Sequence, residues 1–125
     1  MADGHIPDDL RDFILQHIDS ITQLEALLLL RANAAEAWDV PKAKARLYAA
    51  EDEVTRVLER LSADGFLIHD GNGYRYQCKE SETAAKVDRL AALYASHLIP
   101  VTNMIHDKLR HVRAFADAFR FRKDP

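Results

Sequence analysis

Lysine and arginine residues gather on two neighbouring segments near the middle of the chain, where they could contact phosphate groups. Five basic residues make up this group: Lys42, Lys44, Arg46, Arg56 and Arg60. Contacts between such side chains and phosphates provide much of the affinity of nucleic-acid-binding proteins. Acidic residues at 51–53 and 59 lie among them, so a solvated helix face with internal ion pairs is the alternative interpretation.

Three further residues join these cations as candidate DNA contacts. Thr55 is adjacent to Arg56, Asp52 lies one helical turn before it, and Arg75 follows a glycine-rich segment. Aspartate can accept a hydrogen bond from the amino group of cytosine, although it adds no affinity for phosphates. The predicted DNA-contacting residues are Lys42, Lys44, Arg46, Asp52, Thr55, Arg56, Arg60 and Arg75.

Two helices joined by a tight turn are predicted to position these residues. Asp39 suits the N-cap of the first helix, and Pro41 lies in its first turn, where the missing N–H of proline costs nothing. Residues 48–50 form the turn, and the second helix begins at Glu51. Its apolar residues recur at spacings of three and four and predict one buried stripe: Val54, Val57, Leu58 and Leu61.

A β-hairpin is predicted after the second helix. Gly65 suits the left-handed residue that ends a helix. Apolar and polar residues then alternate on both sides of residues 70–73, whose Asp-Gly-Asn-Gly sequence is typical of a turn. The charges of Asp70 and Arg75 are expected to cancel near the tip of this hairpin.

The segment from Trp38 to Cys78 resembles the winged-helix regulators of the MarR and PadR type. The matching positions are Trp38, Ala43, Leu47, Val54-Thr55-Arg56, Leu58, Leu61 and Gly65-Phe66-Leu67-Ile68. The resemblance implies a winged helix-turn-helix that presents its second helix to the major groove of DNA and its hairpin to the flanking backbone. Ala50 departs from the family pattern, in which Ser or Thr often caps that helix.

The expected fold is mainly α with a small β-hairpin, divided into three regions. Residues 1–19 form an acidic N-terminal helix, residues 20–78 the winged helix-turn-helix domain, and residues 79–125 a region of long C-terminal helices that mediates dimerisation. Ser20 and Gln23 predict a capping box at the start of a largely apolar helix that reaches about Ala32.

A long helix is predicted from residue 84 onward, bent at Pro100 because proline lacks the N–H that would bond Ser96. Asp107 is a candidate cap for a last helix. Apolar residues spaced by three and four form a seam for pairing with a second copy: Val87, Ala91, Tyr94, Leu98, Val101 and Ile105. So small a domain cannot cover all the apolar surface of such a helix, which predicts a homodimer.

The composition is that of a globular protein. The chain has 125 residues, 48% of them hydrophobic, and a formal net charge of −3. No apolar run approaches the ~20 residues of a membrane span, and no secretion signal is recognised. Cys78 is the single cysteine, so no intrachain disulfide can form, and we expect a cytoplasmic protein.

The sequence carries no recognisable catalytic motif, such as a glycine-rich phosphate loop or a His-Glu-x-x-His segment. His106 and His111 lie near Asp107, but their spacing points the two imidazoles to different helix faces, so no metal site and no cofactor are expected. Cys78, Tyr48 and Tyr94 are expected to pack against the core. We therefore expect a dimeric DNA-binding regulator that is not an enzyme, with any small-molecule effector left open. A winged-helix module that binds another protein is the alternative.

Overall fold

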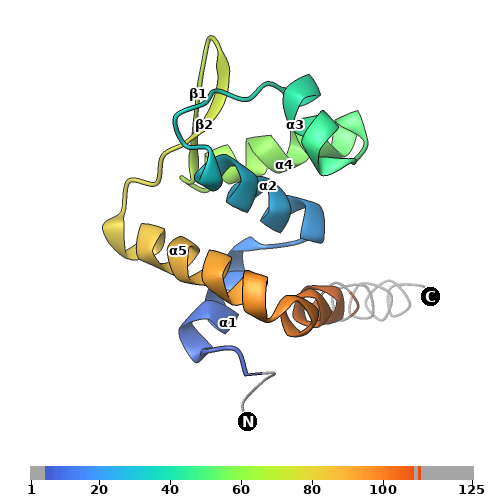
Figure 1. Cartoon of the computed structure of the whole chain (residues 1–125), viewed down its shortest axis with the longest axis vertical. Coiled ribbons are helices and arrows are strands. Elements are labelled where there is room, and N and C mark those ends of the chain that lie inside the picture. Colours follow the sequence, from blue (N-terminus) through green and yellow to red (C-terminus); the bar gives the residue numbers. More distant parts are fainter. Residues whose placement is uncertain (1–4, 109, 111–125) are drawn as a thin grey trace, which may run out of the picture.

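The computed structural model describes residues 5–108 and Arg110, and Figure 1 shows how their elements are arranged. The elements follow one another as α1 (Asp8–His17), α2 (Ile21–Ala32), α3 (Val40–Leu47), α4 (Glu51–Ala63), β1 (Leu67–Asp70), β2 (Gly73–Tyr76) and α5 (Ser81–Ser96). A further helix covers residues 98–108. This part of the chain is therefore mainly α-helical with a small antiparallel hairpin, as the sequence predicts.

The predicted ends of α3 and α4 are confirmed by their capping contacts. The carboxylate of Asp39 accepts a hydrogen bond from the backbone N–H of Lys42 at 2.8 Å. Gly65, which follows the C-cap residue Asp64 of α4, has a φ of +91°. The N–H of Phe66 then donates to the carbonyl of Leu61 at 3.0 Å, which is the hydrogen bond expected where a left-handed glycine ends a helix.

The predicted stripe of α4 faces the core, and all four of its residues, Val54, Val57, Leu58 and Leu61, are buried. In Figure 1, α2 and α4 lie in the middle of the molecule, with α3 and the hairpin at one end and α1 and α5 at the other. α4 packs against both α2 and α3. The orientation of α4 is therefore set by its apolar face, and its opposite face is left to the solvent.

The hairpin packs against α4 and α2 and is also bonded to the backbone of Trp38. β1 and β2 pair with Leu67 opposite Tyr76 and Asp70 opposite Gly73. Trp38 forms an isolated antiparallel bridge with Tyr74, in which each backbone N–H donates to the other residue's carbonyl at 2.7 Å. Trp38 lies between α2 and α3 in the sequence, so this bridge connects the hairpin directly to the start of α3.

The start of α2 shows a modified version of the predicted capping box. The hydroxyl of Ser20 accepts from the N–H of Gln23 at 3.0 Å, but the side chain of Gln23 accepts from Asp19 rather than from Ser20. Within the described residues, no single helix has the length and apolar character needed to cross a membrane. α1 and α2 meet that test only when taken together, and they are bent by 108° relative to each other.

The prediction of one long helix bent at Pro100 is wrong. α5 ends at Ser96, and His97 leaves the helical conformation with a φ of −128° and a ψ of 47°. The next helix starts at once, with the N–H of Val101 donating to the carbonyl of His97. Pro100 therefore lies in a first turn, where its missing N–H is tolerated.

Asp107 does not cap a helix, because the helix of residues 98–108 runs through it. The last helix predicted after Asp107 lies, beyond Lys108, outside the described residues with the exception of Arg110. The carboxylate of Asp107 instead forms an ion pair with Arg110 at 3.3 Å, one turn further along.

The assignment of three residues to the predicted dimerisation seam is also wrong, because Val87, Val101 and Ile105 are buried inside this chain's own core. Both helices of this seam contact the N-terminal part of the chain, because α5 packs against α1 and Lys108 donates to the carbonyls of Ile14 and Ile18. Ala91 and Tyr94 are half-buried, and the Tyr94 hydroxyl donates to Glu25 on α2 at 3.2 Å. Of the seam, only Leu98 remains largely accessible, with half of its surface exposed.

Candidate nucleic-acid interface

The turn between α3 and α4 lies where the sequence predicts it and contains an unusual backbone conformation. Tyr48 follows α3 in the left-handed region, with a φ of 54° and a ψ of 42°, and its N–H donates to the carbonyl of Lys44 at 2.9 Å. α4 then begins at Glu51, with no side chain capping its first turn. The turn therefore reverses the chain without the glycine that usually occupies a left-handed position.

Three of the predicted DNA contacts are exposed and form no ion pair with any residue of the described chain: Lys44 and Arg46 on α3, and Arg56 on α4. Two others lie beside Arg56. Asp52 is exposed, while the hydroxyl of Thr55 donates to the carbonyl of Glu51 at 2.9 Å. The exposed faces of α3 and α4 thus carry these cations together with the acidic side chains of Glu51, Asp52 and Glu59.

The ammonium group of Lys42 is engaged in contacts within its own chain. Its ammonium group lies 2.7 Å from the carboxylate of Glu36, donates to the carbonyl of Ala37 at 3.3 Å, and lies 4.4 Å from the centre of the Trp38 ring. The guanidinium of Arg46 lies over the same ring, at 5.9 Å. The cations of α3 therefore cover the buried tryptophan, and the charge of Lys42 is already compensated.

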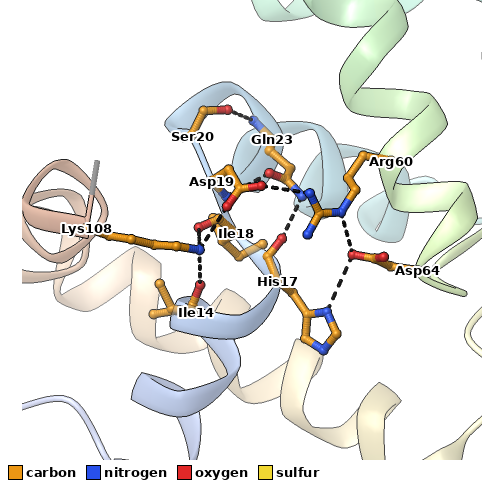
Figure 2. A network of polar contacts seen from close by, with 9 residues as sticks. All are labelled: Ile14, His17, Ile18, Asp19, Ser20, Gln23, Arg60, Asp64 and Lys108. Atoms are coloured by element: carbon orange, nitrogen blue, oxygen red, sulfur yellow. Dashed lines mark hydrogen bonds and ion pairs between the residues drawn. The ribbon is translucent and has the colours of Figure 1, made fainter. Parts of the chain in front are cut away.

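Arg60, also predicted as a DNA contact, is held by two carboxylates of its own chain (Figure 2). Its Nε donates to Asp64 at 3.0 Å, and its Nη1 donates to Asp19 at 2.8 Å. A guanidinium bonded on both sides gains little from a phosphate, because it would first have to release these partners. Within the folded chain Arg60 therefore has a structural role at the end of α4, and its contact with DNA stays a prediction.

Figure 2 also shows that Asp19 connects α4 to the helix of residues 98–108. The ammonium of Lys108 donates to the second oxygen of Asp19 at 2.9 Å and to the carbonyl of Ile18 at 2.8 Å. Burial acts to raise the pKa of Asp19, but the hydrogen bond from Lys108 and the charges of Lys108 and Arg60 outweigh it, so this pKa lies below its ordinary value. One carboxylate therefore connects three segments that are distant in the sequence.

The one arginine of the hairpin, Arg75, already has an acidic partner. Arg75 is half-buried and lies 3.7 Å from the carboxylate of Asp70, which agrees with the predicted charge compensation. The rings of His69 and Tyr74 stack at 4.1 Å on the neighbouring pair of the ladder. Arg75 is therefore positioned beside the hairpin tip, but its guanidinium is already partly engaged.

The structure places Tyr48 differently from the sequence-based expectation. Tyr48 is 93% exposed, more than Leu15, Leu98 or Ile99, whereas we expected it to pack. α3 ends at Leu47, so Tyr48 no longer follows the apolar face of that helix. The sequence did contain a sign of this exposure, because Tyr48 lies in the predicted turn between two helices, and a side chain in a tight turn has few neighbours to pack against.

Cys78 and the histidines show no ligand-binding arrangement among residues 5–108 and 110. The thiol of Cys78 is half-buried, and this burial raises its pKa, which disfavours the reactive thiolate. Within the same residues, no group of three or more His, Cys, Asp or Glu side chains is placed to hold a metal ion. His111 lies outside the described residues.

Comparison of the chain with models of known protein families, with curated proteins and with solved structures gave no match. The functional interpretation therefore depends on the geometry of α3, α4 and the hairpin. Exposed cations lie on two successive helices, α3 and α4, which are joined by a turn with a left-handed residue. The hairpin is bonded to Trp38, shortly before the start of α3.

Proposed function

We propose that this protein is a winged helix-turn-helix transcriptional regulator, similar to the MarR and PadR type, that binds double-stranded DNA in the cytoplasm. The observation that carries the proposal is the combination of exposed Lys44 and Arg46 on α3 with exposed Arg56 on α4, one tight turn apart. In this interpretation α4 enters the major groove, α3 crosses the phosphate backbone, and the hairpin that Trp38 anchors contacts the flanking DNA.

Replacing Lys44 and Arg56 together by alanine is expected to weaken binding to duplexes of any sequence. Each phosphate contact contributes about −0.9 to the slope of log K against log salt, so losing two should flatten the slope by about 1.8. Fluorescence anisotropy of a random duplex at several salt concentrations measures both quantities. The control is the double variant Lys79→Ala and Lys86→Ala, which removes the same charge outside α3 and α4. Equal slopes for the two variants would contradict the assignment.

A second candidate function is a winged-helix module that binds a basic protein partner. It is favoured by the acidic side chains of Glu51, Asp52 and Glu59, which are exposed on the proposed recognition helix. They offset the three free cations of the same surface and would repel phosphates. The titration above separates the two candidates, because a parent protein that fails to bind duplex DNA even at low salt would support the interaction module.

The proposal includes a homodimer, because a single winged helix contacts few base pairs and two copies can occupy half-sites about 34 Å apart. Surface remains for such a contact: Leu15, Leu98 and Ile99 are 45%, 50% and 64% exposed. We therefore propose that the second copy covers the start of the helix of residues 98–108 rather than the whole predicted seam.

Leu98→Glu is expected to convert the dimer to a monomer without unfolding the chain, since this side chain is already half-exposed. A carboxylate buried in an apolar contact without a partner is strongly unfavourable. Light scattering at micromolar concentration measures the mass, with Ala85→Glu as a control at an exposed position of α5. A parent protein with the 14.2 kDa mass of one chain would rule out the dimer.

A further inference from the structure

Tyr48 combines two features that are unfavourable for an isolated domain. Its backbone has a φ of 54°, a conformation that glycine and asparagine adopt far more readily than a tyrosine. The residue is 93% exposed, so its side chain gains almost nothing from burial. A residue that is disfavoured both by its backbone and by its exposure is explained most simply by a contact made in a complex.

The surroundings of Tyr48 leave room for a ligand and include one cation. An open groove runs along α3 to the start of α4, and its lining residues are Pro41, Lys44, Ala45, Tyr48, Ala49 and Glu51. Ala45 and Ala49 are small enough for a backbone to approach closely, and the exposed Lys44 supplies a positive charge. Glu51 is the single acidic residue of the lining, so the groove carries one charge of each sign and a neutral phenol.

We propose that the hydroxyl of Tyr48 donates a hydrogen bond to a phosphate of the duplex DNA backbone, next to the contact made by Lys44. This inference rests on the DNA-binding function proposed above and adds an uncharged contact that basic residues alone would not reveal. Hydroxyl and phenol groups commonly make phosphate contacts that fix the register of a protein on DNA. The turn is suitably placed for this, because it joins the helix that crosses the backbone to the helix that enters the groove.

The test compares Tyr48→Gly and Tyr48→Phe with the parent protein, in binding to a random duplex and in thermal unfolding. Both variants are expected to bind about tenfold more weakly, the loss expected for one hydrogen bond to a charged acceptor. The salt slope should remain that of the parent, because the phenol releases no counterion, whereas Lys44→Ala should flatten it by about 0.9. Glycine relieves the left-handed backbone, so Tyr48→Gly should melt at the same temperature as the parent or higher.

Each alternative result is decisive. If the parent does not bind duplex DNA, the proposed function fails and the inference fails with it. If the parent binds and Tyr48→Gly binds equally well, DNA binding stands and only the contact by Tyr48 is wrong. Parent-like binding by Tyr48→Phe would also overturn the hydroxyl–phosphate contact. A lower melting temperature for Tyr48→Gly would assign Tyr48 a packing role and overturn the inference.

Discussion

Replacement of Gly73 by alanine is expected to destabilise the protein strongly, by separating the hairpin from the segment at Trp38. An added Cβ would lie 2.5 Å from the carbonyl oxygen of Trp38 and 2.8 Å from its carbonyl carbon. These atoms belong to the backbone and are held by two hydrogen bonds to Tyr74, so they cannot rotate away. Overpacking of this kind costs about 1–3 kcal/mol.

The backbone conformation adds to this cost, because Gly73 has a φ of +130°, which an L-residue rarely adopts. A residue held in a glycine-only conformation costs of order 1–3 kcal/mol. Urea unfolding of the parent and of Gly73→Ala measures the total loss, which should reach about 2–6 kcal/mol.

Gly71 provides the matched control for this experiment, because it lies in the same turn but an added Cβ meets nothing within 4 Å. Gly71→Ala should therefore change the free energy of unfolding by no more than about 0.5 kcal/mol. Equal midpoints for the two variants would mean that the hairpin does not lie against Trp38 as the structure shows. Since Trp38 connects the hairpin to α3, loss of this contact should also impair any binding that uses both.

The second large effect is expected at Leu58, which is completely buried in the middle of the α4 stripe. Leu58→Ala removes apolar contacts and leaves a cavity where α4 packs against α2, a change that costs about 2–5 kcal/mol in well-packed cores. Thermal or urea unfolding measures the loss.

Glu59→Ala is the control for Leu58, since the neighbouring side chain on the same helix is exposed. It should alter the free energy of unfolding by about 0.5 kcal/mol at most. An unchanged midpoint for Leu58→Ala would show that the apolar periodicity of α4 does not correspond to its buried face.

The sequence alone determined those features whose causes lie within a few residues. The Asp39 cap, the left-handed Gly65 that follows α4 and the buried stripe that includes Leu58 were all predicted, because capping and periodicity are local properties. The hairpin around residues 70–73 was predicted for the same reason. Within the candidate interface, the exposure of Lys44 and Arg56 agrees with their positions opposite the apolar faces of their helices.

Tertiary structure decided which partner each of the remaining side chains meets. Arg60 and Lys108 share the carboxylate of Asp19, although Lys108 is 89 residues away from it in the sequence. No local pattern identifies such a partner, so a cation that looked free on a helix face is engaged in the folded chain. Val101 and Ile105 were assigned to an intermolecular seam for a related reason. Periodicity identifies an apolar face, but only the packing of the folded chain decides that the chain covers this face itself.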